Sequence, residues 1–291
     1  MIKKALIGSL ILLFTYALVR DVYKPNITIP QAQWQDNQIA AQSYLYNNTD
    51  NIENIIVGSS MAFWIHTDSL NNFYNLAFGG ESPKEGLNVI KRKGVYPKRV
   101  FIEINLIVRE NETDFYDILY NPIMYPLRKK TTIFRDGKQP LTLATALLES
   151  RVLRPIIPSN IPFFNIKRKE AVKTIKIDEP INNKKRSSHF SDNNNQVIEL
   201  LKEYIDDLKE HGTEVIFFEM PSESIDCNSK KEPQYRTTAK TLFPPEEYIY
   251  IPNPECGSYK TSDGIHLRGD EALRYTRYFR RQVDSLINIG K

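Results

Sequence analysis

Short apolar runs alternate with amphipathic stretches along most of this chain. The apolar runs are residues 54–58, 72–78, 100–108 and 214–220. Each is more continuous than a strand with one solvated face, so we expect strands that are buried on both faces. The amphipathic stretches are residues 82–93, 197–210 and 270–286. This alternation predicts an α/β fold, a three-layer sandwich with a central parallel sheet between helices.

The two later helices should each bury one stripe of side chains. In residues 197–210 the stripe consists of Val197, Leu201, Tyr204, Ile205 and Leu208. In residues 270–286 the expected buried positions are Leu273, Thr276, Phe279, Val283 and Leu286. In a parallel sheet, functional side chains lie beyond the carboxyl ends of the strands. The turns that follow residues 54–58, 100–104 and 214–220 should therefore share one edge of the sheet.

The first residues have the pattern of an export signal. Lys3 and Lys4 precede an apolar run over residues 5–19, and Arg20 follows that run directly. The run is short for a spanning helix, yet no cleavage site with small residues follows it. We therefore expect residues 1–22 to be an uncleaved signal anchor, a single-pass transmembrane segment that leaves the other residues periplasmic or extracellular. A cleaved signal peptide and a buried core helix are the alternatives.

The other residues divide into a linker and a domain. Residues 23–50 are rich in Asn, Gln and Pro, which indicates a linker or a peripheral wrap. Residues 51–291 form the predicted catalytic domain, with an insertion at about 110–195 that is rich in Pro and basic residues. Within the insertion we expect a local helix at residues 141–152. The insertion is either a lid over the site that contacts a glycan or a solvated loop.

Charge and cysteine content exclude several classes of function. The 291 residues have a formal net charge of +4, with both signs interspersed, so nothing indicates nucleic-acid binding. Cys227 and Cys256 are the only cysteines. Export permits a disulfide between them, and two free thiols are the alternative. The pair lacks neighbouring ligands for zinc, and we expect neither a metal nor a cofactor.

Two distant segments supply the residue types of a serine hydrolase. Ser60 follows the apolar strand at residues 54–58, where a sharp turn would expose its hydroxyl. His266 lies three residues after Asp263 and just before a helix. A serine hydroxyl needs a neutral imidazole to remove its proton, and the imidazole needs a carboxylate to fix its tautomer. None of the other three histidines, His66, His189 and His211, has a partner pattern like that of Asp263 and His266. We therefore predict Ser60, His266 and Asp263 as nucleophile, base and orienting acid.

Four short blocks in this order resemble the SGNH, or GDSL-like, hydrolase superfamily. They are Gly58-Ser59-Ser60, the stretch Asn75 to Pro83, Glu103-Ile104-Asn105-Leu106 and Asp263-Gly264-Ile265-His266-Leu267. The resemblance implies a flavodoxin-like sheet. It also implies an oxyanion hole formed by the Ser60 N–H, the Gly80 N–H and the Asn105 side chain, with Gly79 as the second choice for Gly80. The third block departs from the family pattern, because Glu103 stands where Gly is usual and Leu106 where Asp is usual.

The resemblance extends to exported proteins that work with membrane-bound O-acyltransferases. It implies a bacterial cell-envelope enzyme that moves or removes a small acyl group, chiefly acetyl, on a polysaccharide hydroxyl through a Ser60 acyl-enzyme. Polysaccharide, membrane and a membrane-bound O-acyltransferase would be its partners. Two alternatives remain at this point: a general secreted esterase or lipase, and a non-catalytic scaffold for a membrane O-acyltransferase.

Overall fold

The computed structural model describes residues 2–23, 33–109, 114–139, 189–223, 232–267 and 269–289. The chain divides into two compact units. The first comprises residues 1–47 and 113–180, and the second comprises residues 48–112 and 181–291. All the strands and every predicted site residue belong to the second unit.

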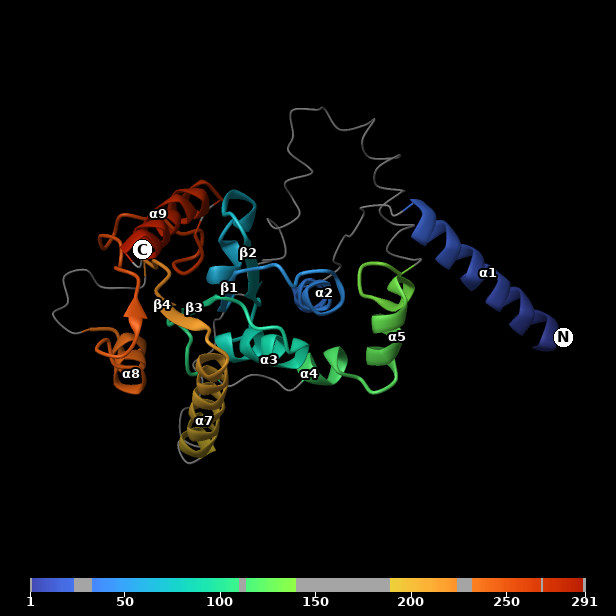
Figure 1. The fold of residues 1–291 in the computed structure, drawn as a ribbon, viewed down its shortest axis with the longest axis horizontal. Helices are drawn as coiled ribbons and strands as arrows, with labels where there is room; N and C mark the ends of the chain where they lie inside the picture. The colour runs from blue at the N-terminus through green and yellow to red at the C-terminus, as the bar shows by residue number, and fades with distance from the viewer. Residues whose placement is uncertain are drawn as a thin grey trace. The chain divides into compact units, whose positions relative to one another are not determined.

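The second unit is built on a sheet of five parallel strands (Figure 1). The strands are β1 (Asn54–Gly58), β2 (Phe73–Ala77), β3 (Arg99–Glu103), β4 (Glu214–Phe218) and β5 (Ile249–Tyr250). Their order is β2-β1-β3-β4-β5, the doubly wound order of flavodoxin-like folds. In this order the direction of winding reverses between β1 and β3, and ligands bind at that switch point. Strand β1, which Ser60 follows, is one of the two strands at this switch point.

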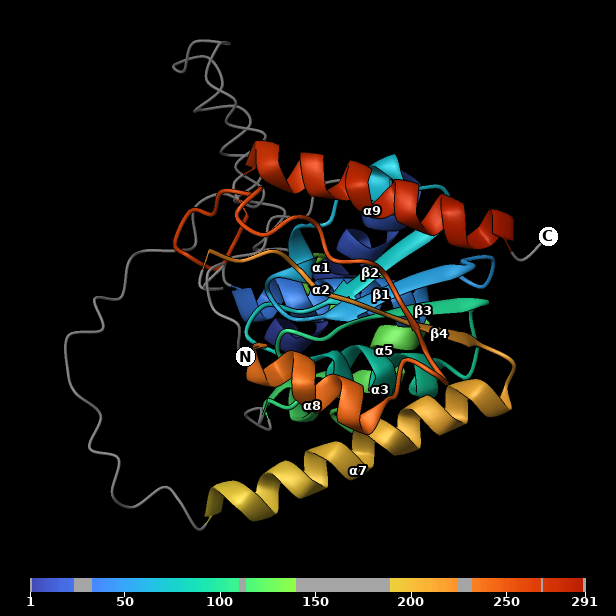
Figure 2. The ribbon, with the colours of Figure 1, turned by 90° about the vertical axis from the view of Figure 1, so that its left-hand side faces the viewer.

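Helices cover both faces of this sheet, as Figure 2 shows. Helix α9 (Gly269–Ile289) crosses one face, and α3 (Pro83–Lys93), α7 (His189–Glu210) and α8 (Gln234–Leu242) lie on the other. Two short 3-10 helices, η1 (Ala62–Trp64) and η2 (Thr67–Ser69), link β1 to β2. The second unit therefore has the α/β architecture with a central parallel sheet that the sequence pattern predicts.

Buried side chains explain why each helix lies where it does. On α9 the side chains of Tyr275, Phe279 and Val283 join a core cluster with Phe101 and Phe218 of the sheet. On the opposite face, α3 approaches the sheet so closely that a Cβ at Gly86 would lie 2.7 Å from the carbonyl oxygen of Leu76. The predicted stripe of α7 is buried at Val197, Leu201, Tyr204, Ile205 and Leu208.

The structure corrects the sequence prediction at several places in the second unit. The strand predicted over residues 100–108 ends at Glu103, because the chain turns at Ile104 and closes a bond from the Ile107 N–H to the Ile104 carbonyl at 3.3 Å. Leu273 is 45% exposed, since the buried face of α9 passes through Ala272 and Tyr275 instead. Helix α8 and the two-residue strand β5 were not predicted.

The first unit is helical within the described residues. Its elements are α1 (Ile2–Tyr23), α2 (Gln33–Tyr46), α4 (Asp114–Leu119), α5 (Met124–Lys130) and the 3-10 helix η3 (Thr132–Phe134). Helix α2 lies where composition predicts a linker or wrap. Its buried face is polar: the Gln42 amide donates to Asp136 at 2.5 Å, and the same carboxylate pairs with Arg128 at 3.1 Å.

Two predictions for the first unit concern helices. The helix predicted at residues 141–152 lies outside the described residues. Helix α1 includes the apolar run of residues 5–19. Among the helices that the structure describes, none combines the length and the apolar character needed to cross a membrane.

Candidate active site

Ser60 lies on a turn that leaves the carboxyl end of β1. Strand β1 is buried along its whole length, and the next residue, Ser59, is fully buried. The backbone then turns into η1, with the Phe63 N–H donating to the Ser59 carbonyl at 3.1 Å. Ser60 itself is half-buried. Its side chain is thus presented at the edge of the sheet by a turn whose base lies in the core.

His266 and Asp263 share a loop that precedes α9. One carboxylate oxygen of Asp263, Oδ1, accepts the backbone N–H groups of Ile265 at 3.1 Å and His266 at 2.8 Å. Gly264 adopts φ 86°, a conformation that residues with a side chain rarely adopt. The Ser262 N–H donates to the His266 carbonyl at 2.8 Å and closes the loop. This local geometry sets the distance between the two side chains.

The three predicted residues form one chain of hydrogen bonds. The Nδ1 atom of His266 lies 2.7 Å from Oδ2 of Asp263, and its Nε2 atom lies 2.8 Å from Oγ of Ser60. The carboxylate can only accept, so Nδ1 carries the hydrogen, and Nε2 is left to accept the Ser60 hydroxyl proton. The structure thereby joins residues that are 206 positions apart in the sequence.

The orienting acid is held in its ionised form. Partial burial raises the pKa of Asp263, but the hydrogen bonds from the His266 ring and from the His266 and Ile265 amides outweigh it, and the net pKa is lowered. The side chains of His266 and Asp263 are 24% and 38% exposed, so the site is open to solvent on this side. An ionised acid next to the ring stabilises the imidazolium that proton transfer would create.

Gly80 lies in a turn just beyond β2. The Glu81 N–H donates to the Phe78 carbonyl at 3.2 Å, and Gly80 has φ 81°, as the third position of a type II turn requires. Within the part of the chain that the structure describes, neither the Gly80 N–H nor the Ser60 N–H has a hydrogen-bond acceptor. Both amides are therefore available as donors to a bound oxygen.

Asn105 has a structural task that the motif did not indicate. Its Oδ1 atom accepts the Met220 N–H at 2.8 Å, and its Nδ2 atom donates to the Met220 carbonyl at 2.9 Å. The side chain thus clamps the segment after β3 to the segment after β4. The amide nitrogen carries a second N–H, for which the described residues supply no acceptor. That N–H is the group Asn105 could offer to an oxyanion.

Glu103 is the functional candidate that sequence reasoning missed. It ends β3 and is fully buried. Its Oε2 atom accepts the Ser59 N–H at 2.7 Å and the Ala62 N–H at 3.3 Å, and the Ser59 hydroxyl lies 2.9 Å from both carboxylate oxygens. A glutamate within the mostly apolar run of residues 100–108 was the available signal, because a buried carboxyl requires hydrogen-bond partners.

Further contacts tie the loop of His266 to the segment after β4. The Ser222 hydroxyl donates to the Gly264 carbonyl at 2.9 Å, and the carboxylate of Glu223 accepts the Thr261 N–H at 2.7 Å. Cys256, just upstream of the loop, is disulfide-bonded, and Cys227 lies outside the described residues. The loop is therefore restrained by bonds from several sides.

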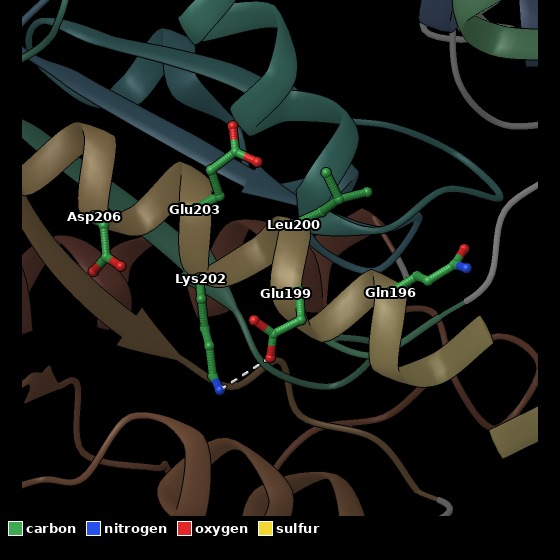
Figure 3. Close-up of a pocket in the computed structure, with 6 residues that line it drawn as sticks. All are labelled: Gln196, Glu199, Leu200, Lys202, Glu203 and Asp206. Atoms are coloured by element: carbon green, nitrogen blue, oxygen red, sulfur yellow. Dashed lines mark hydrogen bonds and ion pairs between the residues drawn. The ribbon is translucent and has the colours of Figure 1, made fainter. Parts of the chain in front are cut away.

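Two hollows elsewhere on the second unit lack comparable chemistry. Figure 3 shows one, lined by Gln196, Glu199, Leu200, Lys202, Glu203 and Asp206 of α7. Their side chains point in different directions, and Lys202 pairs with Glu199 at 3.4 Å, as expected for the solvated side of one helix. The other hollow lies at the amino ends of β1, β2 and β3. No cluster of three or more metal-ligating side chains occurs among the described residues.

Comparison with known proteins gives one distant likeness. The sequence matches no protein-family model and no curated protein. The chain is similar to a solved structure from Streptococcus pneumonia that is provisionally described as a platelet activating factor. The likeness covers 93% of this chain and 96% of that chain, at 10% identity and a TM-score of 0.39. At that level it carries no argument, and the chemistry must be inferred from the site itself.

Proposed function

We propose that the protein is a serine-dependent esterase or O-acyltransferase of SGNH type, which works through an acyl-enzyme at Ser60. The observation that carries the proposal is the continuous chain from Ser60 through His266 to Asp263, with bonds of 2.8 and 2.7 Å. These distances lie within the range for a nucleophile and its base. The position of Ser60 at the switch point of the sheet supports the same conclusion.

The residues have distinct roles in the proposed reaction. Oγ of Ser60 attacks the carbonyl carbon of an ester while Nε2 of His266 takes the hydroxyl proton. The carbonyl oxygen becomes negatively charged, and the Ser60 N–H, the Gly80 N–H and the free Asn105 N–H would donate to it. His266 then gives its proton to the leaving alcohol, which departs and leaves the acyl group on Ser60. Asp263 stays ionised throughout and stabilises the imidazolium.

The second half of the reaction separates an esterase from a transferase. If water attacks the acyl-enzyme, the products are a free acid and the original serine. If a sugar hydroxyl attacks, the acyl group moves to the sugar. In both cases His266 accepts the proton of the attacking hydroxyl and returns it to Oγ of Ser60. We propose acetyl as the acyl group and a cell-envelope polysaccharide as the acyl acceptor, on the resemblance of the four sequence blocks.

The proposed location follows from the first residues of the chain. Lys3 and Lys4 before the apolar run at residues 5–19 favour a membrane anchor with the catalytic unit outside the cytoplasm. A membrane-bound O-acyltransferase would be a natural donor of acyl groups there. Protease treatment of spheroplasts or protoplasts, whose cytoplasmic membrane is intact, should degrade the catalytic unit and spare a cytoplasmic control protein. Full protection of the catalytic unit would refute the location without affecting the chemistry at Ser60.

The decisive experiment follows acyl transfer in the purified full-length chain. Wild type should hydrolyse 4-nitrophenyl acetate and accumulate an acetyl group on the peptide that contains Ser60, detected by mass spectrometry. Ser60→Ala should lose both signals. Added polysaccharide that gains acetyl groups would identify a transferase, and a preference for long acyl chains would favour a lipase. If Ser60→Ala hydrolyses as fast as wild type, the proposal is wrong and a scaffold becomes the better explanation.

A further inference from the structure

We propose that Glu103 is a positioning residue for the reaction at Ser60. Its buried carboxylate fixes the turn that carries the nucleophile, and its negative charge favours the protonated form of the His266 ring. This inference rests on the proposed function of Ser60 and deepens it, because it assigns a second carboxylate to the site. Asp263 orients the ring from the loop side, whereas Glu103 acts from inside the sheet.

Glu103 lies directly against the turn that carries Ser60. It ends β3, next to β1 at the switch point of the sheet, and is fully buried. The backbone beside it is shaped for the carboxylate: a Cβ added at Gly58 would lie 2.5 Å from Oε2 of Glu103 and 2.8 Å from the Cβ of Ala62. No side chain fits there without displacing the carboxylate. The buried position of Glu103 therefore requires glycine at position 58, just before Ser59 and Ser60.

The carboxyl group of Glu103 is held by hydrogen-bond donors of the nucleophile turn. Oε2 of Glu103 accepts two backbone N–H groups, those of Ser59 and Ala62. The Ser59 hydroxyl accepts the Met61 N–H at 3.1 Å and can donate its own proton to Glu103 at 2.9 Å. Two backbone N–H groups and this hydroxyl are the hydrogen-bond partners of the carboxyl group among the described residues. That set suits a carboxylate, because the two backbone groups can only donate.

Burial and the neighbouring positive charge act on Glu103 in opposite directions. Burial is the larger effect and raises the pKa of Glu103 above its usual range, while the Ser59 and Ala62 hydrogen bonds and the positive charge of His266 lower it in part. The described residues include no cation within ion-pair distance of Glu103. The imidazolium formed during acyl transfer is therefore the cation that its charge can stabilise. A charge in a site of low dielectric acts more strongly than the same charge in water.

Other titratable groups around this site do not replace Glu103. Tyr235 on α8 and Tyr275 on α9 interact with it electrostatically, but burial raises the pKa of both phenols, so they stay neutral. Glu219 is a second buried carboxylate, at the end of β4, and Arg236 neutralises it through two bonds of 2.8 Å. Asp263 already bonds Nδ1 of the ring, and the carboxylate of Glu223 accepts the Thr261 N–H on the same loop.

The test compares the full-length wild type with Glu103→Gln, which keeps the shape and removes the charge. The kcat of the variant for 4-nitrophenyl acetate should fall roughly 10–100-fold with little change in KM, because the nucleophile turn loses its anchor. The acid limb of its pH–rate profile should move to lower pH by about 0.5–1 unit, since the ring loses a charge that favours its protonation. A merely structural role would lower kcat at every pH and leave the acid limb of the pH–rate profile at the same pH.

Glu219→Gln is the matched control. It removes the other buried carboxylate at the same edge of the sheet, one that is already paired with Arg236. Its melting temperature should fall, and its acid limb should coincide with that of the wild type. A folded Glu103→Gln protein with an unmoved acid limb, or an equal displacement in both variants, would overturn the proposal.

Two measurements keep this inference separate from the proposed function. A wild type without Ser60-dependent turnover would refute the function, and NMR titration of the His266 ring protons would then judge Glu103 without turnover. The titration midpoint should be lower in Glu103→Gln, and identical midpoints would overturn the inference.

Should Glu103→Gln fail to fold, NMR of wild type with carbon-13-labelled glutamate measures the protonation state of Glu103 directly. The signal of Glu103 is assigned as the carboxyl resonance that shifts in Ser59→Ala. At the pH of the acid limb this resonance should have the chemical shift of a carboxylate, and the chemical shift of a protonated acid would overturn the inference.

Discussion

The candidate site has two layers that differ in exposure and in origin. The outer layer is the half-exposed chain of Ser60, His266 and Asp263. The inner layer, which we call the buried floor, consists of Ser59, Glu103, Asn105 and the Met220 backbone. Residues of the outer layer perform the proposed bond changes, whereas the buried floor joins the ends of β1, β3 and β4 by hydrogen bonds. The difference teaches that the groups that react and the groups that hold them in place come from different layers. Substitutions in the two layers should therefore have different effects on activity and on stability.

Loss of the base should have the largest effect and should leave the buried floor intact. His266→Ala removes the acceptor for the Ser60 proton, so kcat for an aryl acetate should fall about 10⁴-fold or more. The melting temperature should change little, because the ring is partly exposed and its bonds are to the outer layer. His66→Ala is the control and should retain most of the activity. If both variants lose activity equally while folded, His266 is not the base.

Asn105→Ala should affect both layers at once. Loss of its free N–H from the oxyanion hole should lower kcat by roughly 10²–10³-fold. Loss of the clamp leaves the Met220 N–H and carbonyl unsatisfied, which should cost about 1–3 kcal/mol of stability. Denaturant unfolding and steady-state kinetics on the same preparation measure the two effects.

Thr213→Val provides the matched control for that clamp. The Thr213 hydroxyl donates to the Pro97 carbonyl at 2.7 Å and joins the same two strands at their opposite ends. The variant should lose stability and keep kcat. An Asn105→Ala protein with lower stability but normal kcat would remove Asn105 from the oxyanion hole and leave it as a clamp only.

A methyl group at position 58 should disturb the buried floor, because it would collide with the Glu103 side chain. Gly58→Ala places a Cβ against Glu103 and should cost about 1–3 kcal/mol through overpacking. Activity per folded molecule should also fall, because the Ser59 turn must shift. Gly86→Ala is the steric match, with a Cβ 2.7 Å from Val57 and from the Leu76 carbonyl, away from the site. It should lose stability alone, and equal activity losses in the two variants would contradict the distinction between the layers.

The smallest effect should be the contribution of Asp263 to stability. The pKa of Asp263 is lowered in the folded state, so its carboxylate stabilises the fold above the ordinary range near 3.9, and this contribution is lost as the pH falls through the lowered pKa. The melting temperature of wild type should exceed that of Asp263→Asn near neutral pH, and the difference should shrink below about pH 4. A difference that grows on acidification would show that the carboxylate is not stabilised in the fold.

The outer layer could be predicted from the sequence because its signals are local. Asp263 and His266 are three residues apart on one loop, and Ser60 lies two residues after the end of an apolar strand. Their meeting then follows from the rule that carboxyl ends of parallel strands share an edge. The main strands and helices were predictable for a similar reason, since their hydrophobic periods lie within single segments.

The buried floor could not be predicted in the same way. Glu103 bonds to Ser59 across 44 positions and Asn105 bonds to Met220 across 115, so no local pattern reports either contact. The motif suggested an oxyanion role for Asn105 but not its clamp. Glu103 looked like a departure from the family pattern, and only its contacts give it a role. Strand β5 was missed because two residues are too few for a period to appear.

The distance of 206 positions between Ser60 and His266 has a consequence for the synthesis of the protein. A ribosome that has completed β1, β2 and β3 has made the proposed nucleophile and the proposed oxyanion donors, but it has not yet made the proposed base. Ser60 therefore stays an ordinary alcohol until residue 266 has emerged and its loop has docked beside β4. An incomplete chain that stops before this point would have no means of removing acyl groups from cellular esters. Translation itself thus delays the onset of reactivity until most of the sheet can fold around it.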